Sequence, residues 1–119
     1  LRLERDAPVP LVLFEHPWVC RGAAISALAG IGRGYRIAFS SPSLPGLMAA
    51  VAAGMGVTVR SPRSLRPDLL VVNDLSTAPL PDLEFTLYGR PGVRPEALRK
   101  VEEILEEEIV REHPLHAAA

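Results

Sequence analysis

The sequence predicts an α/β fold in which an open, mostly parallel sheet is flanked by helices. The first sign is the run Leu11–Phe14, which is apolar at every position and is typical of a parallel strand covered on both faces. The second is the stretch Arg36–Pro62, in which strand, polar turn, helix and strand patterns follow one another. A strand–helix–strand unit of this length normally forms a right-handed parallel crossover. The expected order is β-α-β-α-β, followed by two more strands and a last helix.

The central stretch carries a signal for each of its elements. Arg36–Ser40 is a short apolar run and predicts a strand. Ser43 is a suitable N-cap for the next helix, whose first turn tolerates Pro45 because the N–H groups there lack intrahelical partners. Gly54 fits the left-handed position that ends helices, and the β-branched run 57–59 predicts another strand. The helical spacing predicts an apolar face made of Leu47, Met48, Val51 and Ala52.

Two helices and two strands surround this stretch. Pro17 is placed to open a helix, and three glycines within 30–34 to end it. The apolar stripe of that helix is expected at Ala23, Ala24, Ile25, Leu28 and Ala29. Leu69–Val72 and the alternating segment Leu83–Tyr88 predict strands. The last helix is expected from Pro95 to about Val110, with glutamates on its wet face and an apolar stripe of Leu98, Val101, Leu105 and Ile109.

Composition restricts the function classes. The chain has 119 residues, of which 48% are apolar and 23% charged, as expected for one globular domain. The net charge of −1 gives no field that attracts nucleic acid. No apolar run approaches the ~20 residues of a membrane span, so we expect no membrane association.

The first residues and the single cysteine are consistent with a cytoplasmic protein. Residues 1–6 are charged where a signal peptide needs apolar residues. The chain begins with Leu1 rather than Met, and we therefore expect a fragment. Cys20 is the only cysteine, so neither an intrachain disulfide nor a cysteine-based zinc site is available.

No set of residues predicts catalysis, a metal site or a cofactor. Cys20 is expected to be a buried, inert thiol. Ser40–Ser43 follows a strand but reads S-S-P-S, not the G-x-S-x-G of a nucleophile elbow. The glycines of 30–34 lack the spacing and context of a phosphate-binding G-x-G-x-x-G loop. His113 and His116 are separated by a proline, which spoils a shared helical face. We expect a protein that is not an enzyme and has no cofactor or metal.

A ligand site is better supported than a catalytic one. In an open parallel sheet, ligands bind outside the carboxyl ends of the strands. Two such ends are readable, at Phe14–Pro17 and Ser40–Ser43. Each leads into a helix N-terminus, whose free N–H groups favour an anion, so a small carboxylate or other polar organic molecule would fit there. The alternative is that Ser43 is only a cap and Ser40-Ser41 only a turn.

Several segments of the chain also carry a family resemblance. The most specific is A-A-x-A-A-G-x-G-V, which lies within Ser41–Arg60. Together with Pro10–Phe14, Arg36–Phe39, Leu80–Tyr88 and the final helix, it resembles the effector-binding domain of LysR-type transcriptional regulators. The resemblance covers roughly Pro10 to Val110.

The resemblance implies one lobe of a two-lobed domain similar to type 2 periplasmic binding proteins. It places the second lobe at about 10–72, and the returning strand and C-terminal helix, which belong with the first lobe, at 83–111. Most of the first lobe and the DNA-reading helix-turn-helix are absent from this chain, so DNA is expected as a partner only through that absent domain. Self-association, as a dimer or higher oligomer, is expected to cover the stripe of the final helix.

The resemblance also implies where an effector binds. By position, the second-lobe rim that contacts effectors in the family matches Glu15, His16, Ser40, Ser41 and Pro42. Trp18 lies near that rim, and we interpret it as a packing residue at the lobe surface.

The leading hypothesis is an effector-sensing part of a bacterial, cytoplasmic LysR-type regulator. A small molecule bound between the lobes would favour one lobe arrangement and so change how the DNA-binding domains are held. The alternative is a solute-binding protein, or the substrate-binding lobe of an enzyme on the same fold. A third interpretation is an interaction module without a ligand.

Overall fold

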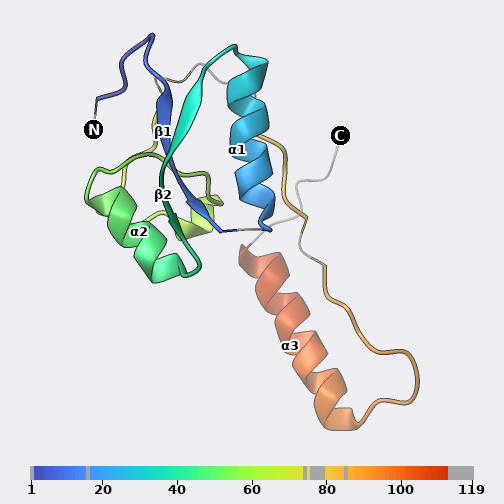
Figure 1. Ribbon diagram of the computed structural model, residues 1–119. Coiled ribbons are helices and arrows are strands. Elements are labelled where there is room, and N and C mark those ends of the chain that lie inside the picture. Colours follow the sequence, from blue (N-terminus) through green and yellow to red (C-terminus); the bar gives the residue numbers. More distant parts are fainter. Residues whose placement is uncertain (1, 16, 74, 76–79, 85, 113–119) are drawn as a thin grey trace. The chain divides into compact units, whose positions relative to one another are not determined.

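The computed structural model describes residues 2–15, 17–73, 75, 80–84 and 86–112 (Figure 1). The chain divides into two compact units, Leu1–Asp82 and Leu83–Ala119. The first unit contains a small sheet with helices, and the second contains one long helix. None of the described helices has both the length and the apolar character needed to cross a membrane.

The sheet of the first unit is built from two parallel strands, β1 (Val9–Phe14) and β2 (Tyr35–Ser41). The helix α1 (Val19–Gly30) connects them. At the carboxyl ends of the strands, Phe14 is the register partner of Ser41, after one register shift in the middle of β1. Both strands and their parallel pairing confirm the sequence-based prediction.

A second parallel neighbour, the segment at Val57, lies on the other side of β1. The strand predicted at 57–59 is reduced to a single bridge, Val57 beside Leu11. The N–H of Val12 donates to the carbonyl of Val57 at 2.8 Å, and the N–H of Val57 donates to the carbonyl of Pro10 at 2.9 Å. β1 therefore has a parallel neighbour on both sides, as a central strand does.

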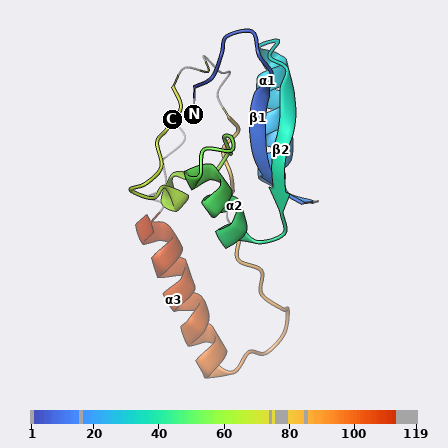
Figure 2. The same ribbon diagram turned by 60° about the vertical axis from the view of Figure 1, so that its left-hand side comes forward.

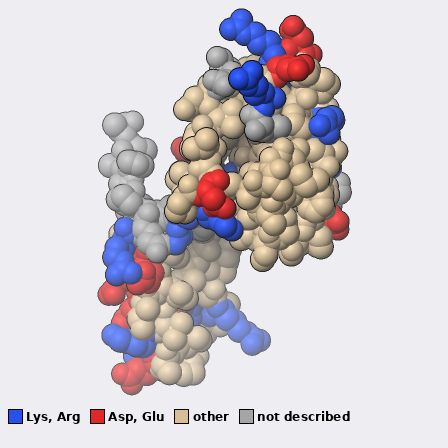
Figure 3. All heavy atoms as spheres, turned by 90° about the vertical axis from the view of Figure 1, so that its left-hand side faces the viewer, with Lys and Arg blue, Asp and Glu red and all other residues tan. Residues whose placement is uncertain are grey.

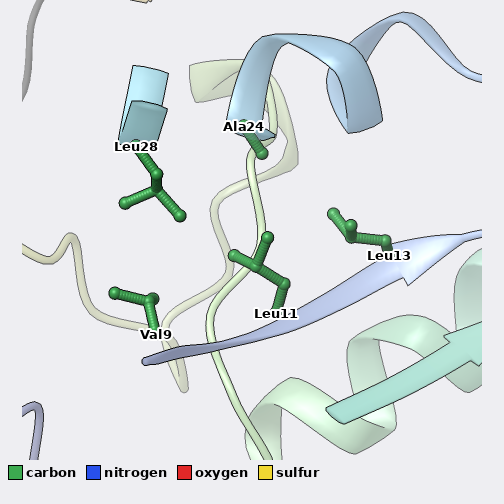
Figure 4. Close-up of a cluster of buried hydrophobic side chains, with 5 residues drawn as sticks. All are labelled: Val9, Leu11, Leu13, Ala24 and Leu28. Atoms are coloured by element: carbon green, nitrogen blue, oxygen red, sulfur yellow. The ribbon is translucent and has the colours of Figure 1, made fainter. Parts of the chain in front are cut away.

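The side chains of β1 alternate between two apolar clusters, because successive residues of a strand point to opposite faces. One cluster joins β1 to α1 and contains Val9, Leu11, Leu13, Ala24 and Leu28 (Figure 4). The other joins β1 to α2 (Leu44–Ala52) and contains Val12, Leu47, Met48 and Ala50. The two helices lie on opposite sides of the sheet (Figures 1 and 2). The prediction that Leu11–Phe14 is covered on both faces is confirmed.

The boundaries of α2 follow the predicted caps. The hydroxyl of Ser43 accepts a hydrogen bond from the N–H of Gly46 at 3.3 Å, and Gly54 has a φ of +77° just beyond the helix. The predicted apolar face is wrong at Ala52, which is exposed, whereas Ala50 is buried. Ala50 lies three residues after the buried Leu47, and residues with this spacing share a helical face.

The helix α1 differs from its prediction at its N-terminal end and in one residue of its stripe. It begins at Val19 rather than at Pro17, with Trp18 in the N-cap position. Its buried residues are Cys20, Ala24 and Leu28, spaced four apart, which turns one narrow stripe toward β1. Ala29, predicted in the stripe, is exposed because it falls outside this spacing. The predicted glycine turn is present, with a φ of +66° at Gly32.

Two predicted strands are absent from the described residues. After the short 3₁₀ helix η1 (Pro62–Ser64), Leu69–Val72 forms no strand, and Leu70 is 90% exposed. The described residues of Leu83–Tyr88 also form none. A strand needs a neighbour for its hydrogen bonds, and the described residues offer neither segment such a neighbour.

The second unit contains α3 (Glu96–Glu112), close to the predicted bounds. Ion pairs on the helix join Lys100 to Glu103 and Glu108 to Arg111, and Arg94, just before the helix, pairs with Glu102. Apolar side chains on the helix are about half exposed, namely Leu98, Val101, Ile104, Leu105 and Val110.

Candidate functional site

Three residues lie in a row across the carboxyl edge of the sheet: Ser41, Phe14 and Arg60. Ser41 is the last residue of β2 and the register partner of Phe14, the last residue of β1. On the other side of β1, the guanidinium carbon of Arg60 lies 5.7 Å from the centre of the Phe14 ring. Parallel strands bring their carboxyl ends to one edge, where ligands bind in open α/β sheets. This edge is the candidate site.

Phe14 is the centre of the row. Its ring lies 4.9 Å from that of Trp18, centroid to centroid, with a tilt of 36°. Its carbonyl accepts a hydrogen bond from Nη1 of Arg21 at 3.3 Å. Trp18 is 49% exposed, so the aromatic pair has one partly buried member and one that faces solvent. The interpretation of Trp18 as a packing residue agrees with its contact to Phe14.

Arg60 is held by few contacts for a partly buried guanidinium. Nη2 donates to the hydroxyl of Ser64 at 3.2 Å, and the cation lies over Phe14 within the ~6 Å at which such contacts are attractive. Nε is buried and has no hydrogen-bond partner among the described residues. A buried donor without a partner costs about 1–3 kcal/mol. Arg60 therefore keeps hydrogen-bonding capacity that the described contacts do not use.

In the serine turn between β2 and α2, the hydroxyls of Ser41 and Ser43 form their hydrogen bonds within the turn and to the start of α2. Ser41 is buried, and its hydroxyl accepts the N–H of Ser43 at 3.1 Å and lies 3.1 Å from the carbonyl of Ser43. The hydroxyl of Ser43 in turn caps α2 through Gly46. The hydroxyls of Ser41 and Ser43 thus shape the turn and cap α2. Ser40 is partly buried, and Pro42 is exposed.

A shallow groove lies beside this edge, between α2 and η1. It is about 450 Å³ in volume and is lined by Leu44, Pro45, Met48, Arg63, Ser64, Leu65 and Arg66. Arg66 is paired with Asp68 through two hydrogen bonds of 2.9 Å. Ser64 links the groove to the site, because it both lines the groove and holds Arg60.

The described side chains form no metal centre, and the face drawn in Figure 3 carries no continuous patch of one charge. Within the described ranges, no group of three or more His, Cys, Asp or Glu side chains is placed to hold a metal ion. On the face drawn in Figure 3, basic and acidic side chains are interspersed around a broad uncharged area. Neither sign forms a continuous patch there, in keeping with the net charge of −1.

Comparison with known proteins decides the family. The family model of the LysR substrate binding domain matches residues 1–109. The chain belongs to the LysR substrate-binding domain family. The resemblance and the fold class inferred from the sequence are both confirmed, since LysR substrate-binding domains have the type 2 periplasmic-binding-protein-like fold.

Two curated relatives of this LysR domain are transcriptional regulators. The HTH-type transcriptional regulator DgdR of Burkholderia cepacia is 40% identical over 81 residues, which are 67% of this chain and 28% of the relative. The HTH-type transcriptional regulator PecT of Dickeya dadantii (strain 3937) is 34% identical over 84 residues, 70% of this chain and 27% of the relative. The match thus spans a little over a quarter of the length of each relative.

The site residues predicted for the LysR domain fall at the carboxyl edge as far as they are described. The N–H of Glu15 donates to the carbonyl of Ser41 at 3.2 Å, which joins Glu15 to the serine turn. Ser40 and Pro42 flank Ser41 in the sequence. His16 lies outside the described residues, as do His113 and His116.

Arg60 is not among the site residues predicted from the sequence. A signal for it was present. Arg60 follows Val57 by three residues, as Phe14 follows Leu11, and Val57 pairs with Leu11. If the segment 57–59 is paired in parallel with β1 so that Val57 lies opposite Leu11, Arg60 falls opposite Phe14.

Proposed function

We propose that this chain is the effector-sensing part of a LysR-type transcriptional regulator. The observation that carries the proposal is the shared carboxyl edge at which Ser41, Phe14 and Arg60 lie side by side. Such an edge is where open α/β sheets bind small molecules, and here the exposed ring of Trp18 lies against Phe14, close to polar groups. The family match and two relatives named as regulators support the same function.

The proposed rim consists of Glu15, His16, Ser40, Ser41 and Pro42. These residues differ in burial and therefore in the role that we assign to each. Ser41 is buried and shapes the turn, whereas Glu15 and Pro42 are exposed. We therefore assign direct contact with the effector to the exposed members and support of the turn to Ser41.

The mechanism we infer is a shift between two arrangements of the lobes. The first unit would form one wall of the effector site, and a wall from the other lobe would complete it. Residues of about 10–72 would be the second lobe, and 83–111 would belong with the first. An effector that binds one arrangement more tightly shifts the population toward it, and the helix-turn-helix of the whole regulator would report that shift on DNA.

The assignment to a LysR-type regulator also leads to expectations about the localisation, activity and oligomeric state of the whole protein. We infer a cytoplasmic protein that is not an enzyme and that self-associates, partly through the apolar side chains of α3. Light scattering across a dilution series tests the last point. A molar mass equal to one chain of the regulator at every concentration would contradict it.

The alternatives are a solute-binding protein, a substrate-binding lobe of an enzyme, and an interaction module without a ligand. Relatives named as transcriptional regulators favour sensing over the first two. The solvent-facing Trp18 beside Phe14 favours a ligand over the third, because exposed aromatic rings in a polar setting commonly bind something.

The test uses the full-length regulator that contains this chain, with DNA from upstream of its gene as the probe. A panel of small acids, amides and amino acids is titrated while DNA affinity is measured. At least one compound is expected to change that affinity about 5-fold or more, the usual lower range of allosteric coupling. The exposed rim variants Glu15→Ala and Pro42→Ala are expected to weaken the response, and Arg36→Ala, at the opposite end of β2, to leave it unchanged. DNA binding that no compound alters would overturn the proposal.

A further inference from the structure

We propose that Arg60 makes the site selective for organic carboxylates with an apolar or aromatic body. This inference rests on the effector-sensing function proposed above and names the ligand class of the same site. It follows from the place of Arg60 in the sheet, from its unused hydrogen-bonding capacity and from the rings beside it.

The sheet itself brings Arg60 to the site. Val57 bridges Leu11 in parallel, and the chain continues for three residues on each side, to Arg60 and to Phe14. The cation lies 5.7 Å from the centre of the Phe14 ring, so the side chain stays at the carboxyl edge rather than extending into solvent. A residue placed in this way, by a strand bridge three residues earlier and by a ring contact, can hold a ligand group in a defined place.

The guanidinium of Arg60 has hydrogen-bond donors that the described contacts do not use. It carries five N–H groups, of which the described contacts use one, the Nη2 bond to Ser64. Nε has no partner among the described residues, and no described carboxylate pairs with Arg60. Arg66, six residues later, has its fork filled by Asp68 through two parallel bonds of 2.9 Å. A ligand carboxylate could accept two parallel hydrogen bonds from Arg60, as Asp68 does from Arg66, after a small movement that uncovers Nε.

The surroundings fit the rest of such a ligand. Phe14 lies under the cation, and Trp18 lies 4.9 Å from Phe14 with half of its surface exposed. An apolar or aromatic body placed against Trp18 would bury surface that now faces water. A second guanidinium, that of Arg21, is bonded to the carbonyl of Phe14 and adds positive potential. Glu15 opposes it, but its side chain is exposed and thus better screened.

The experiment compares acids with their neutral amides on the full-length regulator. The probes are the pairs phenylacetate and phenylacetamide, and butyrate and butyramide, with Kd measured by calorimetry. We expect at least one acid to bind about 10-fold or more tightly than its amide, since charge-assisted bonds to a guanidinium are strong. Arg60→Gln should bring that ratio close to one. Arg36→Gln, which removes an exposed arginine at the other end of β2, should leave the ratio unchanged.

Two further variants separate ligand binding from a structural role. Arg60→Lys keeps the charge without the fork and should keep part of the preference, even if Arg60→Gln folds poorly. Ser64→Ala removes the tie that holds Nη2; if Arg60 served only to join this segment to β1, Ser64→Ala would act like Arg60→Gln. We expect instead that it preserves the preference for the acid.

The possible results distinguish the two proposals. Acids that bind no better than their amides, or a preference that survives Arg60→Gln in a folded protein, overturn the role of Arg60. If some neutral compound still changes DNA affinity, the sensing function stands without it. If no compound of either kind changes DNA affinity, the sensing function fails.

Discussion

Gly56 lies so close to the backbone of Pro10 that a Cβ at Gly56 would be 2.5 Å from the carbonyl oxygen of Pro10. The same oxygen accepts the N–H of Val57 at 2.9 Å. The approach of the third parallel segment to β1 thus depends on the missing side chain. Since this pairing also helps to place Arg60 beside Phe14, a glycine four residues before Arg60 controls part of the candidate site.

Gly56→Ala is expected to destabilise the first unit by about 1–3 kcal/mol, the usual cost of forcing an extra methyl group into a packed site. The neighbour that would have to move is backbone, so side-chain adjustment cannot relieve the contact. The measurement is the free energy of unfolding from denaturant titration.

The matched control for Gly56→Ala is Gly22→Ala. Gly22 lies in α1 with nothing within 4 Å of its would-be Cβ. There the same change should stabilise by about 0.5–1 kcal/mol, because alanine favours a helix over glycine. Equal effects at the two positions would contradict the assignment of Gly56 to a close backbone approach.

Ser43→Ala is expected to destabilise the protein by about 0.5–2 kcal/mol through loss of the α2 N-cap. The Ser43 hydroxyl accepts from Gly46 and lies 3.4 Å from the Ser41 hydroxyl, so the turn between β2 and α2 should loosen as well. Ser26→Ala, at an exposed position within α1, is the control and should change the free energy of unfolding little. A Ser43 variant as stable as the Ser26 variant would show that the cap contributes nothing.

Local signals predicted the first unit well. The apolar run of β1, the cap at Ser43 and the positive φ of Gly54 depend on neighbouring residues, which the sequence displays directly. Non-local partners were harder to predict. Leu83–Tyr88 alternates as a strand does, but hydrogen bonding to a neighbour decides whether a strand forms, and no pattern in the segment reveals that neighbour.

The carboxyl edge of the sheet was predicted, but the contacts that its side chains make were not. The carboxyl edge follows from the expected parallel sheet, and Glu15 and Ser41 do meet there through a backbone hydrogen bond. Which side chains keep free donors depends on local contacts. Ser41 uses its hydroxyl in the turn, whereas Arg60 retains a buried Nε without a described partner, and spacing in the sequence does not distinguish these two cases.

Leu11→Ala is expected to cost about 2–5 kcal/mol, the range for removing a fully buried leucine from a core. Leu11 is 2% exposed and lies at the centre of the cluster between β1 and α1 (Figure 4). Leu70→Ala is the control, because Leu70 is 90% exposed and its truncation should stay within about 0.5 kcal/mol. A comparable loss at both positions, measured by denaturant titration, would be inconsistent with the described core.

Cys20 is expected to react slowly with a thiol reagent as long as the protein is folded. Its side chain is buried on the face of α1 that also carries Ala24 and Leu28, so a reagent reaches the sulfur only when this packing opens. The rate of modification by Ellman's reagent should rise steeply across the unfolding transition. Leu28→Ala, which opens the cluster two turns away on the same face, should raise the native-state rate, and Leu70→Ala should not. Rapid modification of the folded wild-type protein would show that α1 opens far more readily than its packing against β1 implies.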